Sequence, residues 1–186
     1  MAAALLGCAI FTIAVANARA AEGGACAGVA GQPAKFRPLA QPGAVPPVPF
    51  QSRDGGAVTI AQAAGGKGAV VNFWATWCQP CIKEMPALDN LKAQLAKDGI
   101  AVIAISQDKD GLQRVEPFYA KHGYKHLDIH LDAGSAFARA LKIRGLPTTV
   151  LFDARGRELG RLEGIEEWDA PAVVSFIKDC LAKNAS

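Results

Sequence analysis

VNFWATWCQPC, residues 71–81, places two cysteines where a buried strand turns into a helix. The run from Ala69 to Trp74 is apolar apart from Asn72, as expected of a strand covered on both faces. A helix is predicted from Cys78 to about Lys97, because leucines recur on one face at helical spacing. A second apolar strand follows from Ile100 to Ile105. This order predicts a βαβ unit and therefore an α/β fold.

The spacing of Cys78 and Cys81 within this turn predicts redox chemistry. Cys78 faces the unpaired backbone N–H groups and the positive end of the helix dipole, both of which favour thiolate over thiol. We therefore expect Cys78 to be the nucleophile that attacks a substrate disulfide. Cys81 lies one turn further on and is expected to resolve the mixed disulfide and release the product. Pro80 fits this position, because a first helical turn tolerates a residue without an N–H.

The rest of the chain predicts the elements of a single domain. One hairpin is expected around Asp54-Gly55-Gly56, and another around the turn at residues 153–156, which begins with Asp and ends with Gly. The last helix has an apolar face at helical spacing. The further strands are expected at residues 48–51, 57–60, 127–131, 148–152 and 158–163, and the further helices at residues 111–121, 135–141 and 169–183.

The chain divides by composition into three segments. Residues 1–20 are apolar with no charged side chain before Arg19, which predicts a signal peptide or a membrane anchor. Residues 21–47 are rich in Ala, Gly and Pro, a composition that buries too little apolar surface to fold alone, and are expected to be a tether. Residues 48–184 are expected to form the folded domain.

Composition also argues against several other classes of protein. The net charge is only +3 and no run of Lys or Arg exceeds two residues, so nucleic acid is not an expected partner. Five cysteines are an odd number, which excludes a fully paired disulfide scaffold. A zinc site would need two ligands besides the cysteine pair. His122, His126 and His130 are spaced four apart, but Gly123 interrupts the helix that would align them, and no metal site is expected.

Three motifs together resemble a known family. Residues 71–81, Glu84-Met85-Pro86 and Gly145-Leu146-Pro147-Thr148-Thr149 are similar to the thioredoxin-like proteins of the TlpA type, which have relatives in cytochrome c biogenesis. The resemblance covers about residues 50–181. It implies a thioredoxin fold with a central βα insertion, here preceded by the predicted N-terminal β-hairpin. It also implies a bacterial protein, periplasmic or tethered to the inner membrane, that keeps particular cysteine pairs reduced.

The resemblance implies roles for residues around the cysteine pair. Leu146-Pro147 would be a cis peptide bond beside the cysteines, which leaves the backbone of Leu146 to pair with an extended substrate. A trans proline that opens an edge strand is the alternative. Trp77 is also expected to contact substrate. Glu84 matches a carboxylate that handles protons for the buried cysteine, although an exposed glutamate on a solvated helix face fits the same spacing.

Two further cysteines lie far from the pair. Cys26 falls in the expected tether and Cys180 in the last helix. A structural disulfide between them would fasten the tether to the domain in an oxidising compartment. Free thiols are the alternative, with Cys180 then a buried apolar residue.

The sequence thus predicts a thiol:disulfide oxidoreductase without a cofactor. The resemblance implies a periplasmic reductant whose substrates are cysteine pairs in apocytochrome c or in copper-site proteins of respiratory oxidases, supplied with electrons by a membrane thiol carrier. We expect a monomer. A disulfide-forming oxidase of the DsbA kind is one alternative, although the segment between Ile105 and Pro147 is too short for its helical insertion. A copper carrier that uses Cys78 and Cys81 as soft ligands is another.

Overall fold

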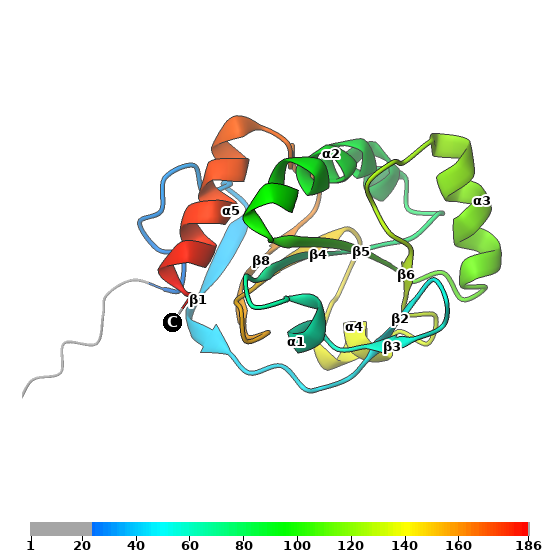
Figure 1. Ribbon diagram of the computed structural model, residues 1–186, viewed down its shortest axis with the longest axis horizontal. Coiled ribbons are helices and arrows are strands. Elements are labelled where there is room, and N and C mark those ends of the chain that lie inside the picture. Colours follow the sequence, from blue (N-terminus) through cyan, green and yellow to red (C-terminus); the bar gives the residue numbers. More distant parts are fainter. Residues whose placement is uncertain (1–23, 186) are drawn as a thin grey trace, which may run out of the picture.

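An eight-stranded mixed sheet runs through the computed structural model, which describes residues 24–185 (Figure 1). The strand order is β1-β8-β7-β4-β5-β6-β2-β3. The central strand β4 (Ala69–Trp74) is buried along its whole length, and it pairs in parallel with β5 (Ala101–Ser106) and antiparallel with β7 (Thr148–Phe152). The outer strands are β1 (Phe36–Gly43), β2 (Phe50–Ser52), β3 (Ala57–Val58), β6 (His130–Leu131) and β8 (Glu158–Glu163).

Helices cover both faces of this sheet. On one face lie α2 (Gln79–Leu95), α3 (Leu112–His122) and α5 (Pro171–Lys183), and on the other the short helices α1 (Ile60–Ala63) and α4 (Ala136–Ala140) (Figure 1). A single 3-10 turn at residues 96–98 ends α2. The predicted α/β fold, its βαβ unit and its N-terminal hairpin are confirmed.

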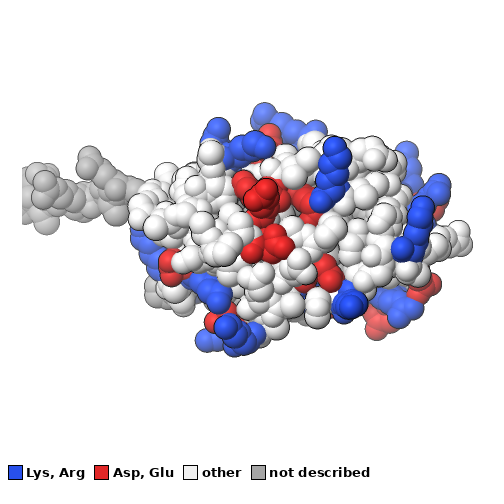
Figure 2. All heavy atoms as spheres, turned by 90° about the horizontal axis from the view of Figure 1, so that it is seen from above, with Lys and Arg blue, Asp and Glu red and all other residues white. Residues whose placement is uncertain are grey.

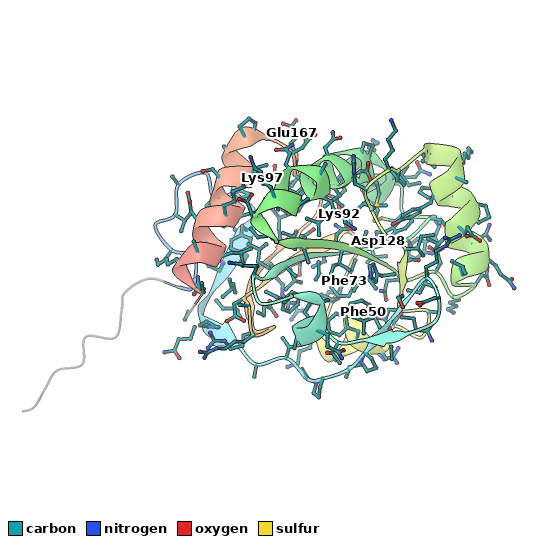
Figure 3. All side chains as sticks on the ribbon, viewed as in Figure 1. Phe50, Phe73, Lys92, Lys97, Asp128 and Glu167 are labelled. Atoms are coloured by element: carbon teal, nitrogen blue, oxygen red, sulfur yellow. A yellow bond between two sulfur atoms is a disulfide. The ribbon has the colours of Figure 1, made fainter. Side chains whose placement is uncertain are left out.

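The core is divided by the sheet into two apolar clusters. Phe50 and Phe73 lie on the side of α1 and α4 (Figure 3), where each ring packs within 6 Å of Phe137, at centroid separations of 5.6 and 5.7 Å. On the opposite side, α2 and α5 contribute the buried side chains of the larger cluster. An ion pair between Lys92 and Asp128 joins α2 to the loop before β6 (Figure 3). Strand β4 can be apolar at every position but Asn72 because both of its faces are covered.

The expected signal peptide or anchor at residues 1–20 lies outside the described residues. Within residues 24–185, none of the helices has both the length and the apolar character needed to cross a membrane.

The expectation of a tether at residues 21–47 needs correction, because part of this segment belongs to the sheet. Strand β1 pairs antiparallel with β8, and the Phe36 ring packs edge-on against Phe176 of α5 at 5.0 Å. Gly160 of β8 permits this approach, since a Cβ at that position would lie 2.6 Å from the carbonyl oxygen of Arg37. Composition alone did not reveal the strand, because the partner that stabilises it lies more than a hundred residues further along the chain.

The expected strand at residues 127–131 is reduced to β6, which has two residues. The reason is local: the carboxylate of Asp89 on α2 accepts hydrogen bonds from the backbone amides of Lys125, His126 and Leu127, at 3.2, 2.8 and 2.8 Å. Because the Leu127 amide is bound in this way, it cannot join a strand ladder, and the strand does not begin at that residue. The same contacts fasten α2 to the loop that follows α3.

Candidate active site

Cys78 and Cys81 form a disulfide at the beginning of α2, with their Cα atoms 5.2 Å apart. Cys78 is the N-cap residue of this helix, and its sulfur accepts a hydrogen bond from the amide of Cys81 at 3.3 Å. Cys78 retains 5% of its surface exposed, whereas Cys81 retains none. The first sulfur is therefore the one that another protein can reach, and the second is accessible only through the first.

Cys78 opens onto a groove of about 810 Å³, which we call the Cys78 groove. Apolar side chains of Trp77, Ile143 and Leu146 line it, and Trp77 is 66% exposed. The groove is completed by residues that follow β5 and by residues of α4; the full lining is Trp77, Cys78, Gln79, Pro80, Gln107, Lys109, Ser135, Ala138, Arg139, Ile143, Arg144, Gly145 and Leu146. The structure thus brings three sequence-predicted residues, Trp77, Cys78 and Leu146, to one surface.

Leu146 and Pro147 are joined by a cis peptide bond immediately before β7. The loop is held by two hydrogen bonds: the Thr148 hydroxyl donates to the carbonyl of Gly145, and the Gly164 amide donates to the carbonyl of Pro147, both at 2.8 Å. Within residues 24–185, the amide and carbonyl of Leu146 form no backbone hydrogen bond. These two groups are therefore free to pair with an extended segment of another chain.

Glu84 lies one turn beyond Cys81 and is buried, not solvated, with 2% of its surface exposed. Its carboxylate accepts hydrogen bonds from Asn72 Nδ2 at 2.7 Å, from Trp168 Nε1 at 3.0 Å and from the Glu166 amide at 3.3 Å. Burial raises the pKa of Glu84 to about 7, although these three hydrogen bonds act in the opposite direction. At neutral pH this carboxyl is close to the midpoint of its titration.

The raised pKa of Glu84 predicts a pH-dependent stability. Folded Glu84 keeps its proton up to about pH 7, whereas an unfolded glutamate, whose pKa is about 4.5, releases it at lower pH. The native state holds more protons than the unfolded state between these values, so the free energy of unfolding falls as pH rises through this window. We expect wild-type protein to lose up to about 3 kcal/mol between pH 4.5 and pH 7.5 through this group.

Urea unfolding at a series of pH values, for wild type and for Glu84→Gln, measures this effect. The glutamine variant is expected to be less stable at acidic pH, since an amide cannot accept from all three donors, but its stability lacks this pH-dependent loss. Parallel pH profiles for the two proteins would contradict the raised pKa.

Asp108 holds the turn before the cysteine pair in place, and sequence reasoning missed it. Its buried carboxylate accepts from the Thr76 amide at 2.9 Å, the Thr76 hydroxyl at 2.7 Å and the Ser106 hydroxyl at 2.8 Å. It thereby fixes the turn that presents Trp77 and Cys78 relative to the end of β5. The signal that could have found it is an Asp two residues after the serine that ends a buried strand.

A second disulfide joins Cys26 to Cys180 of α5, with Cα atoms 4.9 Å apart. Both cysteines are fully buried, and neither lines the Cys78 groove. The N-terminal segment is held to α5 by two further contacts, because Asn184 Nδ2 donates to the Ala25 carbonyl at 2.6 Å and Lys183 Nζ to the Ala27 carbonyl at 2.7 Å. This corner of the molecule is separate from the reactive pair.

The three histidines do not come together. His122 ends α3 and stacks on Phe118 at a centroid separation of 4.2 Å. His126 lies in the following loop. His130, in β6, packs edge-on against Phe50 of β2. Over the part of the chain that the structure describes, no group of three or more His, Cys, Asp or Glu side chains is placed to hold a metal ion.

Comparison with known proteins decides the family. A family model described as Redoxin matches residues 40–173. The chain belongs to the Redoxin family. The match includes the cysteine pair, Glu84 and the cis-proline loop, and it begins within β1. The resemblance inferred from the motifs is thereby confirmed at the level of the family.

A curated protein is also similar to part of the chain. The thiol-disulfide oxidoreductase ResA of Bacillus thuringiensis is 32% identical over 99 residues, which cover 53% of this chain and 56% of that protein. The chain therefore spans little more than half the length of this relative.

Two solved structures show the fold. A thiol:disulfide interchange protein of the thioredoxin family from Chlorobium tepidum is 26% identical, with a TM-score of 0.57 and coverage of 74% of this chain and 97% of that one. The exposed lipoprotein thioredoxin Etrx1 of Streptococcus pneumoniae is 21% identical, with a TM-score of 0.60 and coverage of 70% and 97%. The predicted thioredoxin-like fold is confirmed.

Proposed function

We propose that this chain is a thiol:disulfide oxidoreductase that reduces cysteine pairs in other proteins. One observation carries the proposal: the Cys78–Cys81 pair lies at a helix N-terminus, with Cys78 at the edge of a groove and Cys81 buried beneath it. A helix N-terminus stabilises the thiolate, and the difference in burial assigns the attacking and resolving roles.

The reaction begins with both cysteines reduced. The Cys78 thiolate attacks one sulfur of a substrate disulfide, a mixed disulfide forms, and the other substrate sulfur leaves as a thiolate. Cys81 then attacks the Cys78 sulfur, and the bond to substrate breaks. The substrate has gained two electrons and, after protonation, is a dithiol, and the enzyme has become the Cys78–Cys81 disulfide seen in the structure.

Glu84 is proposed to take the proton that Cys81 loses before it attacks. Its pKa, raised to about 7 by burial, suits proton transfer at neutral pH, and it lies one helical turn beyond Cys81. Asn72 of β4 lies beside Glu84. Its side-chain amide does not act as an acid or base, but it donates a hydrogen bond that orients the Glu84 carboxylate. Trp77, Leu146 and Pro147 are proposed to hold the substrate, with the free backbone groups of Leu146 pairing with it in extended form.

We place this reaction outside the cytoplasm of a bacterium, in the periplasm. The apolar residues 1–18 and the buried Cys26–Cys180 disulfide both support an exported protein, since structural disulfides persist in oxidising compartments. The proposed substrates are cysteine pairs of proteins that receive haem or copper, such as apocytochrome c. A reductant in such a compartment needs a supply of electrons, and a membrane thiol carrier is the proposed donor.

The direction of electron flow is tested by the reduction potential of the Cys78–Cys81 pair. The full chain is equilibrated with glutathione or dithiothreitol buffers, and the fraction of reduced pair is followed by the fluorescence of the neighbouring Trp77 or by alkylation. We expect a value near that of thioredoxin, roughly −270 mV. A value near roughly −120 mV would identify a disulfide-forming oxidase instead.

A further inference from the structure

Three cations surround the Cys78 groove, and they come from three separate segments. Lys109 follows β5, Arg139 belongs to α4 and Arg144 lies in the loop before the cis-proline. All three side chains are exposed, and no Asp or Glu lines the groove. Because Lys109 lies about thirty residues before Arg139 and Arg144 in the sequence, the fold is what brings it to the same surface.

The acidic residues nearest in sequence to these three cations contact other groups. The carboxylate of Asp108 is buried and accepts from Thr76 and Ser106. That of Asp132 is buried and accepts from the amides of Phe137 and Ala138 in α4. Asp110 lies within 3.7 Å of Arg114. Among the ion pairs of the described residues, none includes Lys109, Arg139 or Arg144. Arg139 donates one hydrogen bond to the Gly134 carbonyl at 2.6 Å, but the positive charge of all three side chains is left without a carboxylate partner among the described residues and can attract a bound anionic group.

The positive groove is not simply a consequence of the overall charge. The net charge is only +3, and the face shown in Figure 2 carries a group of acidic side chains near its centre, with Lys and Arg spread around it. Charge on this molecule is thus distributed unevenly. A cationic surface at the reacting sulfur raises the encounter rate with anionic partners and disfavours cationic ones.

We propose that the Cys78 groove selects protein segments in which acidic residues flank the reactive cysteine pair. The apolar side chains of Trp77, Ile143 and Leu146 accept the body of an extended segment, and the cations at the rim pair with its Asp or Glu side chains. This inference rests on the proposed disulfide reductase function and defines its substrate class.

Two oxidised peptides of equal length test the proposal, identical except that one has Glu and the other Gln on both sides of its disulfide. The reduced full chain is mixed with each peptide, and the second-order rate constant for this single turnover is measured at about 0.01 M and about 1 M ionic strength. We expect the Glu peptide to be reduced about tenfold faster at low salt, with the preference almost lost at high salt.

A triple variant, Lys109→Gln/Arg139→Gln/Arg144→Gln, is expected to bring the ratio of the two second-order rate constants close to one. The matched control is Lys67→Gln/Lys97→Gln/Lys125→Gln, which removes the same charge from exposed positions outside the groove and is expected to keep the wild-type ratio. Using a ratio cancels any general change in reactivity.

Equal rates for the two peptides with wild type, or an unchanged ratio in the groove variant, would overturn the inference. A small neutral disulfide such as hydroxyethyl disulfide shows whether the proposed substrate class alone is wrong or whether the proposed reductase function is wrong as well. If it is reduced and no charge preference is seen, only the substrate class is wrong, whereas failure to reduce any disulfide removes the proposed function and the inference together.

Discussion

Cys78→Ser is expected to abolish disulfide exchange, with a loss of at least roughly a thousandfold in rate. A serine hydroxyl is not ionised at neutral pH and forms no mixed disulfide, so the helix N-terminus has no thiolate to stabilise. Cys81 cannot substitute, because it has no exposed surface. The measurement is the rate at which the reduced chain reduces a protein disulfide such as that of insulin.

The companion variant, Cys81→Ser, is expected to behave differently. Cys78 still attacks, but no resolving thiol follows, so a mixed disulfide accumulates with one substrate bound to each chain and is visible as a mass increase under non-reducing conditions. Cys26→Ala/Cys180→Ala, assayed well below its unfolding temperature, serves as control because it keeps the reactive pair. A Cys78→Ser protein as active as wild type would exclude the proposed mechanism.

The second large effect concerns stability. Replacing both Cys26 and Cys180 by Ala is expected to lower the free energy of unfolding by about 2 to 5 kcal/mol, because this disulfide closes a loop of 154 residues and restricts the unfolded chain accordingly. Urea unfolding without reductant measures the loss.

The matched control for that measurement is Cys78→Ala/Cys81→Ala, in which the lost disulfide spans a sequence separation of only three. Since loop-closure entropy grows with loop length, the control is expected to lose less stability than the Cys26/Cys180 variant. Equal losses in the two variants would show that the long-range disulfide does not act through chain entropy.

The centre of the fold was predictable because its signals are local. An apolar run, a Cys-x-x-Cys turn and a helical leucine spacing are contiguous, and they specify β4, α2 and the position of the reactive pair within a few residues. Strand β1 escaped prediction because it is stabilised by pairing with β8, across a sequence separation of more than a hundred residues. Local composition does not contain that information.

The same distinction applies to the site. The spacing of Glu84 from Cys81 indicated a shared helix, but not that Trp168, distant in sequence, donates to its carboxylate and encloses it. Burial of that side chain, and hence its raised pKa, follows from tertiary packing alone. Lys109 is likewise an ordinary surface residue in the sequence, and only the fold brings it to the same groove as Arg139 and Arg144.

The two edge strands of the sheet affect the tendency of the protein to aggregate at high concentration. An unpaired strand edge is a template on which a foreign chain can add and begin an aggregate. Here one edge, β3, has only two residues, and the other, β1, contains two prolines and an irregular register between Pro38 and Gly43. Proline offers no amide to an incoming strand. Both borders thus discourage polymerisation while the groove beside Cys78 remains open to extended polypeptides.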